Sequence, residues 1–330
     1  MKKYLFVALA AAALAGCTND EWVDNGTPQD GEDKVPILMS AGLEASVAST
    51  KAVVTGTTFP DNTANLFRMV AYTSSSAFTG ADYFNESSRH DLPVSSRKDD
   101  GDNQVLYLNP AQYYDTDAAV NLYFYAFAPG DNSWTYTAGA TPTATYTISG
   151  DDDVMYAQNT TGYNKTSANK PNLAFTHLLR KLDFTIKAAS GVEPGGAAVK
   201  SVSIATQNTK LTLNVTTGAI TKWETPTALT VTPSAPVTIP ANSANAAPIG
   251  SIMCQPAVTE QQEETLQVTV TLDDGNSTQL TGTLKPTSPA GGDAGKAYTV
   301  NLEYSMKEIL ATATITEWVS AGGAITVPVQ

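Results

Sequence analysis

Basic side chains are scarce in this chain of 330 residues, in which 19 Lys and Arg stand against 32 Asp and Glu and the formal net charge is -13. Proteins that bind nucleic acid neutralise its phosphates with clustered Lys and Arg. Charged residues of all kinds make up only 15% of the chain. The sequence therefore argues against a nucleic-acid partner.

Cysteine is also scarce, with only Cys17 and Cys254 in the chain. A scaffold held by disulfides needs more cysteines, so core burial and strand pairing must supply the stability. Cys254 lies in the stretch GSIMCQPAV. An unpaired cysteine in such a stretch is usually a small buried side chain rather than a reactive thiol.

The motifs of enzyme chemistry are missing. His90 and His177 are the only histidines, and the chain has no His-Glu-x-x-His pattern, Gly-x-Ser-x-Gly elbow, P-loop or dinucleotide glycine fingerprint. A packed or interface histidine explains His177 better than a catalytic base. The sequence thus predicts no enzyme, no cofactor and no metal, and a hydrolase stays an alternative only because sites can assemble from distant residues.

Two acidic clusters and one pair of tyrosines leave ligand binding open. The clusters are Asp99, Asp100 and Asp102 in RKDDGDNQ, and Asp151, Asp152 and Asp153 in GDDDV. Carboxylates are calcium ligands, but neither cluster has the full loop spacing with a distal bidentate Glu, and solvated hairpin loops explain them better. Tyr113 and Tyr114 would be able to stack on a sugar if they are exposed, although Tyr is also common at strand edges.

The first residues, MKKYLFVALAAAALAGC, have two lysines, an apolar run and then small residues before Cys17. This order is typical of a secretory signal peptide, and the final LAGC resembles the lipobox of bacterial lipoproteins. We expect a signal peptide over 1–16, acylation of Cys17 and insertion of its chains into a lipid bilayer. The polar and acidic residues 17–33 predict a disordered tether, and the NDE after Cys17 resembles a signal for export to the outer face of the outer membrane.

The rest of the chain predicts an all-β fold. Thr, Ser, Ala, Val and Tyr are frequent, and short apolar or alternating segments recur between turn residues. The clearest is TLQVTVTLDDGNSTQLTGTL, where alternate residues 266 to 272 face one side and DDGNS makes a hairpin turn. The segment HLLRKL fits either a helix or a strand that is entered through a turn.

A polar stretch without periodicity predicts the division into domains. Residues 156–172, YAQNTTGYNKTSANKPN, contain Gly and Pro and lie between two groups of predicted strands. Such composition is typical of a linker. We therefore expect an N-terminal β-sandwich domain over 34–170 and a C-terminal one over 171–330.

Several segments follow the lipobox in a fixed order: TKAVVTGTTF, NLYFYAFAP, LAFTHLLRKLDFTI and GKAYTVNLEYSMKEILATATITEWVSAGG. The most specific pieces are Phe175, His177, Lys181 and Leu182, and the ATATITEW that ends at Trp318. Together these segments resemble the Bacteroidales fimbrillin family, the subunits of type V pili. The resemblance implies two tandem transthyretin-like β-sandwich domains, which agrees with the predicted strands.

The resemblance also implies a route of assembly. A trypsin-like protease would cut the lipid-bearing precursor after Lys51, where the family typically has arginine. The cut would remove a first strand whose Val35, Ile37 and Met39 alternate as one face, leaving a groove for a strand of another subunit. The expected donor is the C-terminal segment AITVPVQ, in which Ile325, Val327 and Val329 alternate.

The function implied is that of a structural pilus subunit on the surface of a Gram-negative bacterium, reached through lipoprotein export to the outer membrane. Its expected partners are other pilin subunits, membrane lipid through Cys17, a trypsin-like protease and a ligand on a host or bacterial surface. The alternative is a lipid-anchored adhesin or pilus anchor that keeps its first strand. In that case Lys51 is an exposed loop residue and AITVPVQ is the last strand of its own domain.

Overall fold

The computed structural model describes residues 34–43, 59, 62–78, 83–84, 91–98, 104–257, 264–289 and 292–317. All regular structure in these ranges is β-strand, as the sequence predicts. Within the same ranges, no helix has the length and apolar character needed to cross a membrane.

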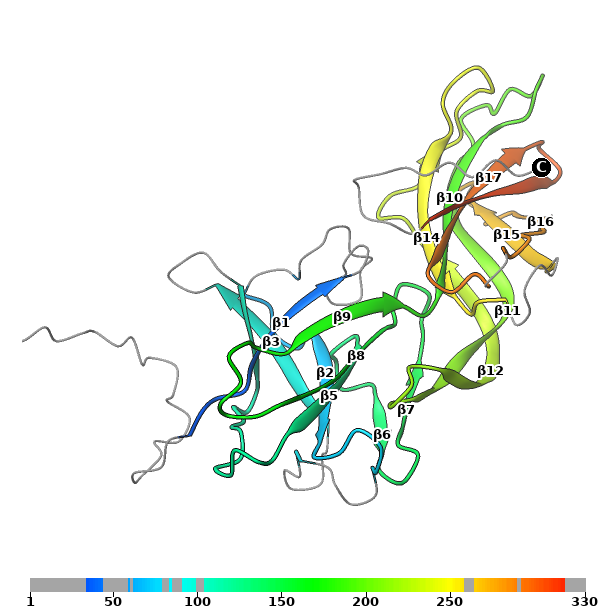
Figure 1. Ribbon diagram of the computed structural model, residues 1–330. Coiled ribbons are helices and arrows are strands. Elements are labelled where there is room, and N and C mark those ends of the chain that lie inside the picture. Colours follow the sequence, from blue (N-terminus) through cyan, green and yellow to red (C-terminus); the bar gives the residue numbers. More distant parts are fainter. Residues whose placement is uncertain are drawn as a thin grey trace, which may run out of the picture. The chain divides into compact units, whose positions relative to one another are not determined.

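Seven strands form a closed barrel (Figure 1). In barrel order they are β1 (Leu38–Leu43), β4 (Gln104–Leu108), β3 (Leu92–Lys98), β2 (Phe67–Tyr72), β5 (Leu122–Ala128), β8 (Met155–Tyr163) and β9 (Asn172–His177). Neighbours are antiparallel except at one seam, where β1 runs parallel to β9. The first strand therefore closes the barrel, with β4 on one side and β9 on the other.

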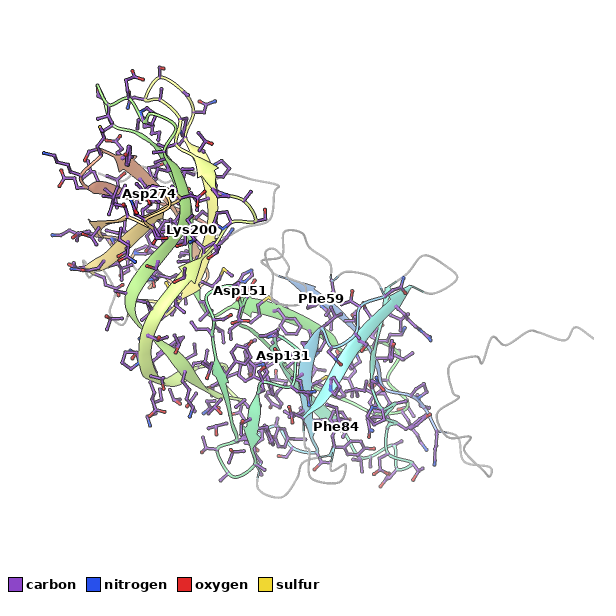
Figure 2. All side chains as sticks on the ribbon, turned by 180° about the vertical axis from the view of Figure 1, so that it is seen from behind. Phe59, Phe84, Asp131, Asp151, Lys200 and Asp274 are labelled. Carbon is purple, nitrogen blue, oxygen red and sulfur yellow. The ribbon has the colours of Figure 1, made fainter. Side chains whose placement is uncertain are left out.

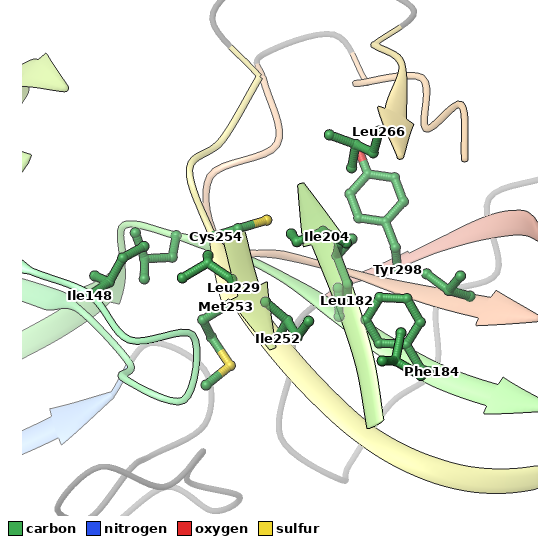
Figure 3. Packing of buried hydrophobic residues seen from close by; sticks show 14 of the residues in the cluster. Ile148, Leu182, Phe184, Ile204, Leu229, Ile252, Met253, Cys254, Leu266 and Tyr298 are labelled. Atoms are coloured by element: carbon green, nitrogen blue, oxygen red, sulfur yellow. The ribbon is translucent and has the colours of Figure 1, made fainter. Parts of the chain in front are cut away.

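The remaining strands form two sheets. One has the order β14 (Ala247–Cys254), β10 (Arg180–Ala188), β17 (Lys296–Tyr304) and β18 (Ile309–Glu317). The other has the order β16 (Gln279–Leu284), β15 (Leu266–Leu272), β11 (Ala198–Asn214), β7 (Thr143–Thr147) and β6 (Thr135–Thr137), with β12 (Ile220–Val231) and β13 (Val237–Thr238) also paired to β11. Side chains of both sheets share one apolar core, and Figure 3 shows Phe184, Ile204 and Tyr298 within it.

The same core extends to the outer face of the barrel. Phe127 on β5 packs against Trp134 with ring centroids 4.8 Å apart, and Trp134 packs against Tyr146 on β7 at the same distance. Although β7 lies among the barrel strands in sequence, it pairs with β11 over residues 143–147. Strand pairing thus joins segments from both sides of the predicted domain boundary.

The long hairpin of β11 and β12 also contacts the barrel through its turn. The hydroxyl of Tyr156 on β8 donates a hydrogen bond of 2.8 Å to the carbonyl oxygen of Val215. Gly218, with a φ of +73°, lies so close to Tyr156 that a Cβ there would be 2.3 Å from the ring atom Cδ1. Only glycine fits both the backbone conformation and the space.

Three predicted segments can be compared with the structure, and one of them differs from it. The hairpin over 266–284 is confirmed, with Leu266, Val268 and Val270 almost fully buried. The assignment of 156–163 to a linker is wrong, because these polar residues form most of β8 between β5 and β9. HLLRKL is a turn at Leu178 and Leu179 that leads from β9 into β10, so the strand alternative holds.

Two glycines with nearly equal φ values test the contact between hairpin and barrel. Gly191 has a φ of +75°, and no atom lies within 4 Å of the place that a Cβ would occupy. We expect Gly191→Ala to lower the free energy of unfolding by about 1–2 kcal/mol, the cost of the left-handed conformation. Gly218→Ala should cost about 1–3 kcal/mol more, because the methyl group overlaps Tyr156.

Urea unfolding monitored by Trp fluorescence gives both values. Equal losses for the two variants would show that Tyr156 does not restrain the turn.

Candidate functional site

Hydrogen bonds hold the first strand on both of its sides, each along a different half. In the first half, the Ile37 amide donates to the carbonyl of Gln112 at 2.8 Å, and the Tyr114 amide donates to the carbonyl of Val35 at 2.9 Å. In the second half, the Ser40 amide donates to the carbonyl of Pro171 at 2.9 Å. Residues 40–43 then run in parallel register with residues 172–175. The strand therefore bridges two segments that have no other direct pairing across this seam.

Two inward side chains of this first segment belong to the barrel core. Ile37 and Met39 are each 1% exposed, and Ala41 packs partly buried against the same apolar cluster. Val35 continues the alternation but is 37% exposed, at the rim. Full burial of an aliphatic side chain contributes about 1.5–3 kcal/mol, so Ile37 and Met39 together contribute about 3–6 kcal/mol.

An aromatic cluster lies in the core into which these side chains project. Phe59, which is labelled in Figure 2, packs against Phe67 on β2 and Phe175 on β9, with ring centroids 5.4 Å apart in each case. Phe67 and Phe175 are 4.8 Å apart. Phe175 is also the residue in register with Leu43, the last residue of β1. The cluster thus lies where the parallel seam ends.

Tyr114 is a further buried neighbour of the first strand. Its side chain is 9% exposed and belongs to the barrel core. Burial, with a smaller contribution from Tyr163, raises the pKa of Tyr114 to about 12. The phenol therefore stays neutral in the core at ordinary pH.

The segment from β9 to β10 carries the Phe-x-His pattern found in the sequence, and its residues have separate structural roles. Phe175 lies in the barrel core, and Leu182 lies in the core between the two other sheets. Nδ1 of His177 is 2.8 Å from Oδ1 of Asp153, and both side chains are buried. His177 is therefore a packed histidine, as the sequence predicts.

Arg180, three residues after His177, forms a second buried ion pair. The guanidinium of Arg180 is 3.3 Å from Oδ2 of Asp293 and 2.5 Å from Oε2 of Glu264, and its Nε is 3.2 Å from Sγ of Cys254. Asp293 also accepts a hydrogen bond of 3.2 Å from the hydroxyl of Tyr298. These contacts tie the start of β10 to the loop before β17.

Cys254 has the buried position that the sequence predicts, with an exposed fraction of 0%. Burial raises the pKa of its thiol, although the charge of Arg180 opposes the shift. A thiol with a raised pKa and no exposure is a poor nucleophile.

Within the acidic stretch 151–153, Asp151 is exposed as predicted for a solvated loop, whereas Asp152 and Asp153 are buried and contradict that prediction. Asp152 accepts hydrogen bonds from the Tyr146 hydroxyl at 3.1 Å and from the Ser149 amide at 2.6 Å, and Asp153 pairs with His177. Both carboxylates are buried because they satisfy polar groups at the end of β7 and β9. Among the described residues, no group of three or more His, Cys, Asp or Glu is placed to hold a metal ion.

For the tyrosine pair, the sequence leaves stacking on a sugar and a place at a strand edge as alternatives, and the structure decides against stacking by both rings. Tyr114 is buried in the barrel, so it offers no face to a sugar. Tyr113 is partly exposed, and its backbone pairs with Pro36. The two rings therefore do not form an exposed surface on which a sugar can stack.

Several predicted site residues lie outside the described ranges, so their roles stay predictions. They are Cys17, Lys51, His90, Asp99, Asp100, Asp102, Ile325, Val327 and Val329. Of the predicted displaced strand, Val35, Ile37 and Met39 are all described.

Sequence reasoning missed the residues that surround the first strand. Phe175 is part of the Phe-x-His pattern, but nothing in its local sequence indicates that it lies beside residue 43. The alternation of buried and exposed residues in β9 indicates a strand. It does not indicate a parallel partner 132 residues earlier in the chain.

Comparison with known proteins gives a consistent assignment. The model of the fimbrillin-like family matches residues 50–318. A second model, for a prokaryotic membrane lipoprotein lipid attachment site, matches residues 1–18. No curated protein sequence matches the chain.

Solved structures show similarity of fold. A proposed cell adhesion protein from Bacteroides uniformis aligns with a TM-score of 0.56 and 18% identity, covering 88% of this chain and 100% of its own. Another from Bacteroides ovatus aligns with a TM-score of 0.51 and 16% identity, covering 88% of this chain and 99% of its own. At these identities the likeness concerns the fold alone.

Truncations along the first strand test its part in the core. We expect Met39→Ala to lower the free energy of unfolding by about 2–5 kcal/mol, because it leaves a cavity among buried side chains. Val35→Ala is the matched control on the same side of the strand and should cost less than about 0.5 kcal/mol, because Val35 lies at the rim.

Chemical unfolding of the unlipidated chain measures both losses. Equally small values would show that the first strand is not an integral part of the barrel core.

Proposed function

The chain belongs to the fimbrillin-like family, and from this premise we propose that it is a structural, non-enzymatic subunit of a cell-surface pilus. The observation that carries the proposal is the place of the first strand: a segment near the start of the chain closes the barrel and lies between two strands that do not otherwise pair at that seam. A terminal strand in this position is one that can be exchanged for a strand of another chain.

The proposed route begins with lipidation of Cys17, which the match to a lipid attachment site over residues 1–18 supports. The acyl chains hold the precursor at the outer membrane, on the cell surface. A trypsin-like protease then cuts after Lys51, and the segment that contains β1 leaves the barrel. The positive charge of Lys51 is what the specificity pocket of such a protease recognises.

Loss of the first strand leaves a groove that is energetically unfavourable while it is empty. The burial of Ile37 and Met39 is worth about 3–6 kcal/mol, a large part of the roughly 5–15 kcal/mol that stabilises a typical domain. Backbone groups of β4 and β9 also lose their partners. Both deficits favour the entry of another strand.

Phe59 lies on the other side of the proposed cut and would stay with the trimmed chain. Its ring covers Phe67 and Phe175 independently of β1. We propose that this contact keeps the barrel core closed at one end of the groove while the strand is replaced. The donor is the segment with Ile325 and Val327 from a neighbouring subunit.

The proposed domain organisation is that of two tandem transthyretin-like β-sandwich domains, divided at the turn between β9 and β10 instead of at residue 170, because β9 pairs with barrel strands. The turn between β9 and β10 supports a division in this region, because Phe175 and Leu182 belong to different apolar clusters. The pairing of β7 with β11 joins the two parts.

A second candidate is a lipid-anchored adhesin or pilus anchor that keeps its first strand. The pairing of β1 with both β4 and β9 favours it, since the barrel is already closed without a donor strand. The two candidates differ in whether the peptide bond after Lys51 is cut.

Substitution at the proposed cleavage site separates the candidates. We expect Lys51→Ala to leave the precursor with its lipidated first residue and to abolish polymer on the cell surface, because the chain loses the positive charge that the protease pocket recognises. Lys51→Arg should retain both cleavage and polymer. Lys34→Ala, which removes an exposed lysine just before β1, is the matched control and should have no effect.

Mass spectrometry of sheared surface material identifies the first residue of each variant. A wild-type chain that begins at Ala52 supports the pilus subunit. A wild-type chain that begins at lipidated Cys17 contradicts it and supports the anchor or adhesin.

A further inference from the structure

The site vacated by the first strand accepts side chains in a defined order of size. Along the first strand it consists of an exposed position at Val35, two large buried positions at Ile37 and Met39, and a small, partly buried position at Ala41. A replacement strand must match this order, because a larger side chain at the Ala41 position overpacks the core and a smaller one at Met39 leaves a cavity.

The proposed donor has its own order of sizes. Its alternate residues are Gly323, Ile325, Val327 and Val329, and Pro328 lies between the last two. The side chain at the first of these positions, Gly323, is the smallest, and Pro328 lies near the other end of the segment. Because the site has its small position at only one end, the two directions of entry are not equivalent.

Entry in the same direction as β1 conflicts with the site. If Gly323 takes the position of Val35, then Val329 takes that of Ala41 and overfills it. Pro328 then takes the position of Ser40, whose amide donates the hydrogen bond to Pro171. Proline has no amide hydrogen, so this bond is lost.

A shift of two residues in the same direction does not restore the fit. Ile325 then lies at the rim and Val329 at the position of Met39. The segment 323–329 in that case supplies nothing at Ala41 and does not replace the register of 41–43 with β9. Less of the core is covered than β1 covers.

We infer that the donor segment of a second copy of this chain enters in the direction opposite to β1, with Gly323 at the Ala41 position. This inference rests on the proposed function and specifies its partner and register. The four matched positions are Val329 at Val35, Val327 at Ile37, Ile325 at Met39 and Gly323 at Ala41.

The same register also matches the proline of the donor to a proline of the segment that it replaces. Pro328 falls at the position of Pro36, where the structure already has a residue without an amide hydrogen and only an isolated bridge to Tyr113. The reversed strand shifted by two residues either puts Gly323 at the Met39 position or puts Ile325 at the Ala41 position. Each alternative therefore leaves a cavity or overfills the core.

Disulfide trapping between two chains tests direction and register together. Ser40 lies in register with Asn172, with 3.3 Å between their side-chain oxygens. In the inferred register Ala324 takes the position of Ser40. Full-length precursors carrying Asn172→Cys and Ala324→Cys, expressed together in cells that assemble the wild-type polymer, should give an intermolecular disulfide between residues 172 and 324.

Two other cysteine pairs report entry of the donor in the same direction as β1. Asn172→Cys with Pro328→Cys reports the unshifted strand in the same direction as β1, and Asn172→Cys with Gln330→Cys reports the shifted one. Ser40→Cys with Asn172→Cys in one uncut chain is the positive control and should form an intramolecular disulfide. Each single variant alone controls for pairing between like chains, and Cys254 is buried.

Non-reducing electrophoresis and mass spectrometry of the sheared surface polymer decide the result. A dominant 172–324 disulfide supports the inference. A polymer with a 172–328 or 172–330 disulfide, or with none of the three, overturns the register and leaves the proposed function standing. Absence of polymer from the wild-type chain overturns both.

Discussion

The parallel pairing of residues 40–43 with residues 172–175 is the interaction on which the barrel depends. Every other pair of neighbouring barrel strands is antiparallel, and without β1 the strands β4 and β9 become edges. The seam is short, and β1 meets its two neighbours with different halves of its length. The first strand can therefore leave by breaking only its pairs with β4 and β9, while the loss of the inward side chains of Ile37 and Met39 makes an empty site costly.

The rest of the molecule is arranged so that loss of the first strand has a local effect. Trp134 and Tyr146 pack against the outer face of β5, and the turn that contains Gly218 packs against Tyr156 on β8. Beyond β9, the pairs of His177 with Asp153 and of Arg180 with Asp293 fix the chain where it passes into β10. None of these contacts includes a residue of β1.

Local patterns in the sequence are sufficient for part of this description. The alternation of Ile37 and Met39 predicts a buried face, and the hairpin over 266–284 follows from strict alternation and a Gly-containing turn. Residues 156–163 defeat the same reasoning, since β8 is polar where its side chains face solvent and is stabilised by its neighbours. The partners of β1 and of Asp153 are set by tertiary contacts, which no local pattern encodes.

The central claim is that β1 is an exchangeable strand of the barrel, and hydrogen exchange measured by mass spectrometry tests it most directly. The intact chain is compared with the chain cleaved after Lys51, alone and with a synthetic peptide of residues 321–330, and the amides of β15 and β16 serve as an internal reference. The account predicts that cleavage accelerates exchange in β4 and β9, that the peptide restores protection there, and that the reference is unchanged. Unaltered protection of β4 and β9 after β1 has left would contradict it.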